Sequence, residues 1–159
     1  MSAATLTKLF EINNHAIRVN AEGITDAEAL IQPEPGGNCM NWVIGHIVSS
    51  REGMLRLLGE PAVLTPEQAD RYKRGSAPIT KACAGQGDMP FTKLLEALAT
   101  SQERLLRGIA KADEAKWNEE VPSFGTAREA VHFLHFHEAY HAGQIALLRR
   151  MAGKKGAIQ

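Results

Sequence analysis

Cysteine is scarce in this sequence, and long apolar runs are absent. The chain holds two cysteines, Cys39 and Cys83, which share no CxxC or zinc-knuckle spacing. This pattern excludes the disulfide framework of a small secreted protein, and such free thiols usually pack as small hydrophobic groups. No window approaches the roughly eighteen consecutive apolar residues that indicate a membrane-spanning helix.

The chain also lacks net charge, because 18 basic side chains balance 18 acidic ones. A neutral chain has no general attraction for phosphate backbones or anionic lipids, so the sequence argues against nucleic acid and membrane surfaces as partners. The N-terminal residues lack the basic start and apolar core of a signal peptide. We therefore expect a soluble, cytoplasmic protein.

The sequence does contain enough apolar residues for one hydrophobic core. It has 159 residues, of which 44% are hydrophobic. A chain of this size buries roughly 68–70% of the surface of its unfolded state. We expect residues 1–159 to form a single domain that folds without disulfides or structural metal, so that any bound metal serves a function.

Apolar residues recur at helical spacing in four long stretches, at about residues 3–20, 38–59, 91–111 and 126–153. Thr25-Asp-Ala-Glu28 and Thr126-Ala-Arg-Glu129 indicate capping boxes at helix starts. Thr65-Pro66-Glu67 predicts a short helix within the otherwise irregular residues 60–90. Since no alternating β pattern and no internal repeat is present, the sequence predicts an all-α protein, a bundle of four antiparallel helices.

Four of the six histidines lie in the last predicted helix, and helical geometry divides them. At about 100° per residue, His137 and His141 lie about 40° apart, one turn along the axis, on the apolar face. His132 and His135 face elsewhere. On the second predicted helix, His46 also lies on the apolar face.

Three inward-facing imidazoles predict a shared cation. A histidine pair at i, i+4 can hold one metal ion with N–metal distances of about 2.0–2.1 Å, and His46 would add a third ligand from another helix. Burial of three such rings without partners would be costly. The alternative is purely structural, with each buried histidine donating to a backbone carbonyl and any exposed pair solvated.

Two segments carry a more specific pattern. One is Pro35-Gly-Gly-Asn followed by Asn41-Trp-Val-Ile-Gly-His-Ile, and the other is His137-Glu-Ala-Tyr-His141-Ala-Gly-Gln. Together they resemble the DinB-like superfamily, also called DinB/YfiT-like metalloenzymes, over nearly the whole chain. The resemblance implies an up-down-down-up four-helix bundle with a long crossover between the second and third helices, which suits the irregular residues 60–90.

The resemblance also implies a site and a range of activities. It assigns His46, His137 and His141 as a three-histidine site for a divalent metal ion such as nickel, zinc, manganese or iron, and it implies a homodimer. Some relatives are thiol S-transferases that use bacillithiol, mycothiol or glutathione, and others act as maleylpyruvate isomerases. The partners expected for this chain are therefore a small-molecule thiol and a small electrophile.

Three histidine ligands leave a coordination position open, and a cation there would lower the pKa of a bound water or thiol. We therefore expect a metal-dependent enzyme that activates a thiol or water for transfer to an electrophile, as a thiol S-transferase or hydrolase. The alternative is a non-catalytic helical module for binding or dimerisation, stabilised by the metal. DNA binding, suggested by the family name alone, is disfavoured by the charge balance.

Polar residues near the histidines are candidates for orienting their rings, namely Asn13, Asn41, Glu138 and Gln144. Of these, Glu138 is expected on the solvated face of its helix.

Other side chains have open roles. On the first helix, His15 is a candidate for the mouth of a cavity. Cys39, about two turns before His46, either approaches the cavity or simply packs. The aromatic residues Trp42, Phe136 and Tyr140 are predicted in the core or at an interface, with the wall of a pocket as the alternative.

Overall fold

The computed structural model describes residues 2–82 and 84–158, and its dominant feature is a set of four long helices. They are α1 (Ala3–Ala21), α3 (Met40–Leu57), α5 (Phe91–Lys111) and α7 (Ala127–Met151). Three short helices lie in the connections: α2 (Asp26–Ala29), α4 (Pro66–Arg71) and α6 (Glu114–Trp117). The prediction of an all-α protein is confirmed, and the four long helices match the four predicted stretches within a few residues.

Local capping explains where several helices begin. In α2, α4 and α7 the preceding threonine accepts a hydrogen bond from the third helical residue, whose side chain accepts one from the threonine backbone. These caps are Thr25, Thr65 and Thr126. After α3, Gly59 adopts φ +73°, a left-handed conformation that favours glycine and ends the helix.

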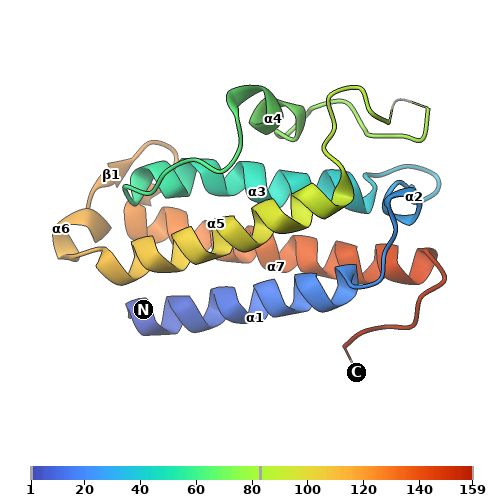
Figure 1. The fold of residues 1–159 in the computed structure, drawn as a ribbon. Helices are drawn as coiled ribbons and strands as arrows, with labels where there is room; N and C mark the ends of the chain where they lie inside the picture. The colour runs from blue at the N-terminus through green and yellow to red at the C-terminus, as the bar shows by residue number, and fades with distance from the viewer. Residues whose placement is uncertain (1, 83, 159) are drawn as a thin grey trace.

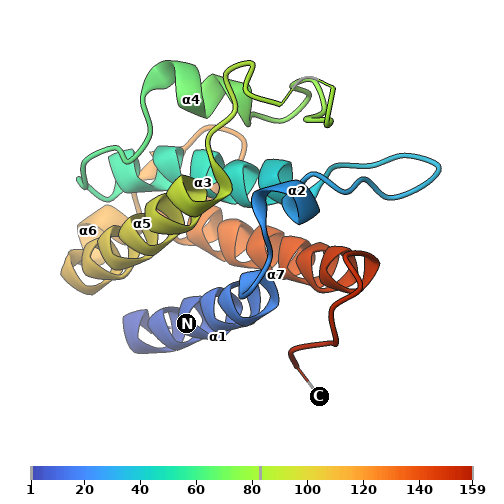
Figure 2. The same cartoon turned by 45° about the vertical axis from the view of Figure 1, so that its right-hand side comes forward.

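The long helices pack around one another so that α3 contacts α5 and α7, and α1 contacts α7 and α5. Figure 1 shows α1 and α7 running in one direction and α3 and α5 in the other. The connection between α3 and α5, which contains α4, passes along the outside of α3 (Figures 1 and 2). This long connection covers the side of α3 on which His46 is found.

A polar layer divides the hydrophobic core into two clusters. One cluster includes Phe10, Leu55 and Leu105, and the other includes Ile47 and Ile145. Between them lie buried polar side chains from all four long helices, namely Asn13, Arg51, Ser101, Gln102 and Glu138. Such groups are tolerated in a core only when they are hydrogen-bonded, so this layer constrains how the helices meet.

The connector before α7 differs from the sequence prediction. It contains a two-stranded antiparallel ladder, β1 (Glu120–Val121) and β2 (Gly125–Thr126). Ser123 and Gly125 have φ values of 70° and 89°, which allow the tight reversal between the strands. Strands of two residues are too short to show an alternating pattern, which explains why the sequence did not reveal them.

Within the part of the chain that the structure describes, no helix combines the length and the apolar character needed to cross a membrane.

Candidate metal centre

The structure brings together the three histidines singled out in the sequence. Nε2 of His137 lies 3.1 Å from Nε2 of His46 and 3.0 Å from Nε2 of His141. The potential ligand atoms of all three residues lie within 4.8 Å of one another. His46 and His141 are only 8% and 7% exposed, and His137 is partly buried. One nitrogen from α3 and two from α7 therefore converge at the α3–α7 seam.

The orientation of His46 is fixed by the crossover loop. Its Nδ1 lies 2.8 Å from the backbone carbonyl oxygen of Tyr72, the residue that ends α4. Because a carbonyl oxygen only accepts, Nδ1 must carry the proton and donate it, which leaves Nε2 with a lone pair. The ring of Tyr72 packs directly over Gly45, where any Cβ atom would overlap the ring. Gly45 thus permits the close approach that supplies His46 with its acceptor.

The same stretch of α3 holds the crossover in place. Asn41 donates to the carbonyl of Met89 (2.9 Å) and accepts from the Tyr72 hydroxyl (3.2 Å). That hydroxyl in turn accepts from the Met89 amide at 2.7 Å. Asn41 was a candidate for orienting the histidines, and it contributes indirectly, by holding Tyr72.

An aromatic ring covers one face of His46. The indole of Trp42 stacks on the imidazole with 4.7 Å between ring centroids and an angle of 17° between planes. Its Nε1–H donates to Ser76 Oγ in the crossover at 2.9 Å. Trp42 is buried, as predicted, and it shields His46 from water.

On α7, a glutamine orients the second ring. Nδ1 of His141 lies 2.7 Å from Oε1 of Gln144, so Nδ1–H donates and Nε2 again carries the lone pair. Gln144 is itself positioned by donating from Nε2 to the Tyr140 hydroxyl at 3.2 Å. Gln144 therefore has the orienting role for which the sequence made it a candidate.

Burial keeps the three rings neutral. It lowers the pKa of His46, despite the opposing effect of the Tyr72 carbonyl, and it lowers the pKa of His141. The pKa of His137 falls to about 4, mainly through burial and secondarily through repulsion from protonated His141 and His46. Neutral imidazole is the form that binds metal ions, so all three rings are ready to act as ligands at pH 7.

The hydrogen-bonding pattern leaves an imbalance that a cation would remove. The lone pairs of His46 and His141 both face Nε2 of His137, which can offer them one proton at most. The other nitrogen of His137, Nδ1, is buried without a hydrogen-bond partner among the described residues. A set of three converging imidazole nitrogens suits a divalent transition-metal ion, so the residues present fit such a group.

Comparison with known proteins agrees with this geometry. The family model of the DinB superfamily matches residues 9–145, a range that includes all three histidines. The chain belongs to the DinB superfamily. None of the curated proteins compared with it matches.

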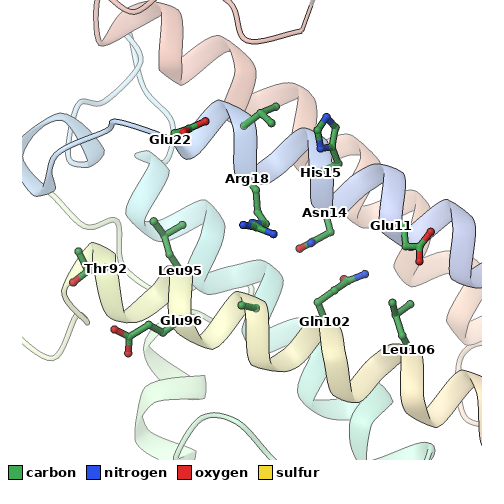
Figure 3. Close-up of a pocket in the computed structure, with 12 residues that line it drawn as sticks. Glu11, Asn14, His15, Arg18, Glu22, Thr92, Leu95, Glu96, Gln102 and Leu106 are labelled. Carbon is green, nitrogen blue, oxygen red and sulfur yellow. The ribbon is translucent and has the colours of Figure 1, made fainter.

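Other candidates on this DinB superfamily chain lie away from the centre. His132 and His135 are outside the cluster, as helical geometry predicts. His15 lines a groove of about 910 Å³ between α1 and α5, and none of the three clustered histidines lines it (Figure 3). Asn13 donates to the backbone carbonyl of His135 at 2.9 Å. Among the described residues, neither His15 nor Asn13 makes a hydrogen bond or ring contact with the three clustered histidines, so the structure does not support the roles predicted for them there.

Three further candidates differ in burial, because Cys39 is buried whereas Phe136 and Tyr140 are exposed. Cys39 is a fully buried residue just before α3, which favours the packing interpretation, and burial raises the pKa of its thiol. Cys83 lies outside the described residues. Phe136 and Tyr140 are exposed on α7, so the prediction of a core position is wrong for both, and the interface and pocket-wall interpretations are left.

The expectation for Glu138 was also wrong. Its side chain is completely buried, and its carboxylate binds Arg51 through two hydrogen bonds of 2.7 and 2.8 Å. Arg51 is equally buried and also donates to Leu98 O, Ser101 Oγ and Gln102 Oε1. This network joins α3, α5 and α7 next to His137. It holds the two helices that carry the histidines.

Sequence reasoning missed Tyr72 and Arg51 entirely. Tyr72 contributes through a backbone carbonyl, which has no sequence signature. Arg51 does lie five residues after His46 on the same predicted helix. A useful signal would have been that Arg51 falls between the apolar positions Ile47 and Leu55 of this helix.

The Gly45–Tyr72 contact yields a first prediction. Gly45→Ala should displace the Tyr72 ring and its carbonyl, and so weaken metal binding about tenfold, as the loss of an orienting partner does elsewhere. The matched control is Gly53→Ala on the same helix, where a Cβ atom meets nothing within 4 Å. Competition of each metal-loaded variant with a chelator measures the affinity. Equal affinities for the two variants would contradict the proposed role of Gly45.

A second prediction concerns the metal-free protein. Unfolded histidine titrates near 6.5, whereas the pKa of His137 in the fold is about 4. Between these values the unfolded state binds more protons, so the stability that neutral His137 contributes is present above pH 6.5 and is lost as the pH falls toward 4. Urea unfolding of chelator-treated protein from pH 7 to 4 should show this loss. In His137→Phe the free energy of unfolding should depend less on pH. If it depends on pH as strongly as in the wild type, His137 is not the source of the loss.

Proposed function

We propose that this protein holds one divalent metal ion on His46, His137 and His141 and uses it to activate a small molecule. The observation that carries the proposal is that the imidazoles of these three residues, from two helices, converge. Their potential ligand atoms lie within 4.8 Å of one another. Membership of the DinB superfamily supports the same assignment. Nickel, zinc, manganese and iron are the candidate ions.

A site with three protein ligands is typical of catalytic metal centres, which keep a position for a non-protein ligand. When bound, a divalent ion lowers the pKa of a coordinated thiol or water and so provides a nucleophile at neutral pH. The surrounding residues orient and shield the histidine rings. The Tyr72 carbonyl and Gln144 hold two rings in the tautomer that exposes Nε2, and Trp42 keeps water from one face of His46.

The proposed reaction is the transfer of a low-molecular-weight thiol to a small electrophile, of the thiol S-transferase type, with hydrolysis as the related use of water. In the transfer, the thiol sulfur forms a bond to carbon, the leaving group departs with its electron pair, and the thiol proton passes to solvent. We further propose an up-down-down-up topology, a single domain over residues 1–159, a cytoplasmic location and a homodimer. The directions of the four long helices in Figure 1 support the topology.

The rival function is a non-catalytic module in which the metal only ties α3 to α7. An assay separates the two. The chain, loaded in turn with each of the four ions, is mixed with glutathione, bacillithiol or mycothiol and monochlorobimane, and adduct fluorescence is followed. Enzyme function predicts an acceleration that His137→Ala abolishes and His135→Ala, a histidine outside the cluster, leaves intact. Binding of one metal ion per chain, with no faster adduct formation for any thiol, would favour the non-catalytic module.

A further inference from the structure

One line of exposed residues runs along the outer face of α7. Its members are separated alternately by four and three positions, which is the average spacing of 3.5 residues that places side chains along a seam between two helices. All of them are exposed: Glu129, Phe133, Phe136, Tyr140, Gly143, Leu147 and Arg150. We call this line the α7 stripe. Its four large apolar members are between 50% and 64% exposed.

The α7 stripe gathers most of the aromatic surface of the molecule. The chain has nine aromatic residues, and five of them are buried. The other four are Phe124, Phe133, Phe136 and Tyr140, of which three belong to the stripe and Phe124 contacts it at 5.2 Å between ring centroids. Single exposed apolar residues are ordinary, but a contiguous cluster of them marks an interaction surface.

Charge is absent from the middle of the stripe and present at its two ends. Between Ala130 and Leu148 the sequence has one charged residue, Glu138, and that side chain is buried against Arg51. Depletion of charge is typical of the centre of a protein interface. At the ends stand an acidic residue, Glu129, and a basic one, Arg150.

We propose that the α7 stripe binds a second copy of this chain, with the two α7 helices antiparallel. This inference deepens the proposed homodimer by naming its surface, and it rests on that part of the proposed function but not on the metal. In an antiparallel pair, Glu129 of each copy lies near the partner's Arg150, whereas a parallel pair would bring like charges together. Such self-complementarity is what a two-fold symmetric interface requires.

Gly143 has a specific place in this interface. It lies in the middle of the stripe, between Tyr140 and Leu147, and a Cβ atom there would meet nothing within 4 Å in the same chain. Within one copy nothing requires a glycine at this position. In the pair, the missing side chain leaves room for an aromatic ring or the helix of the partner.

The interface would also border the metal centre. The Phe133 ring is inclined by 26° to that of His137 at 6.4 Å, and the Tyr140 ring meets His141 edge-on at 5.2 Å. A second copy on the stripe would therefore lie beside the histidine cluster and add apolar groups to its surroundings.

Sedimentation equilibrium of the full-length protein tests the surface. Gly143→Leu should weaken the dimer at least about tenfold by filling the seam, and Phe136→Ala should do the same by removing a central contact. The matched control is Gly53→Leu on α3, another exposed helical glycine whose Cβ would also meet nothing within 4 Å. Circular dichroism verifies that each variant is folded. The control should remain as dimeric as the wild type.

Charge neutralisation tests the orientation. Arg150→Gln and Glu129→Gln, the latter of which keeps the capping box with Thr126, should each weaken the dimer a few-fold, and the double variant should be little weaker than either single variant, because both changes remove the same charge pairs. A dimer strengthened by either single variant would refute the antiparallel arrangement, because each change would relieve a like-charge contact in a parallel pair. A dimeric wild type whose affinity is unchanged by Gly143→Leu and Phe136→Ala would overturn the α7 stripe as the surface. A monomeric wild type would overturn the proposed homodimer itself.

Discussion

Glu138→Leu is expected to destabilise the protein by about 3–5 kcal/mol, because it leaves the buried guanidinium of Arg51 without its carboxylate. Both side chains are completely buried, and the two hydrogen bonds between them are 2.7 and 2.8 Å long. For a chain of this length a loss of that size lowers the melting temperature by roughly 10 °C. Urea unfolding, followed by circular dichroism, measures the change in free energy.

A double variant is the control for this prediction. Arg51→Met with Glu138→Leu removes both charges and retains apolar volume, and such replacements of buried ion pairs are often neutral or stabilising. Ser101 keeps its own bond to the Leu98 carbonyl in that variant. The double variant should therefore recover most of the stability lost in Glu138→Leu. If the two variants are equally unstable, the cost does not come from an unpaired charge.

The second large effect is expected at the metal centre. His137→Ala should weaken binding of Co²⁺ or Zn²⁺ by more than about 100-fold, since it removes a direct ligand, whereas losing an orienting partner costs 10–100-fold elsewhere. His137 occupies the middle of the cluster, within 3.1 Å of one partner and 3.0 Å of the other. Isothermal titration of chelator-treated protein gives the affinity.

His135→Ala is the matched control on the same helix. Its ring packs edge-on against Phe10, with 5.7 Å between centroids, and it is not part of the cluster. Metal affinity should be unaffected in this variant. Loss of affinity in both variants would point to a general disturbance of α7, and retention in both would remove His137 from the site.

Much of this arrangement could be predicted from the sequence because it depends on local periodicity. The spacing of His137 and His141 fixes their relative direction on any α-helix. Apolar neighbours placed His46 on an inner face. Threonine capping boxes marked two helix starts, and Thr65-Pro66-Glu67 marked a third. These signals need no knowledge of how the helices pack.

What the sequence could not give depends on contacts between distant segments. The burial of Glu138 follows from a partner 87 positions away, and a lone glutamate on a helix is usually solvated. Likewise the acceptor of His46 is a backbone carbonyl at Tyr72, whose position depends on the path of the crossover. The α7 stripe was equally hidden, because apolar residues on a helix predict burial until the other faces are known to be covered.

The central claim is that His46, His137 and His141 form one binding site for a divalent ion, and direct titration tests it. Tag-free protein is stripped with a chelator and titrated with Co²⁺, whose visible absorption reports its coordination, and elemental analysis of Zn²⁺-loaded protein gives the stoichiometry. We predict saturation at about one ion per chain, as expected for one set of three ligands, and loss of the signal in His46→Ala. Absence of saturable binding for Co²⁺, Zn²⁺, Ni²⁺, Mn²⁺ and Fe²⁺ would contradict it.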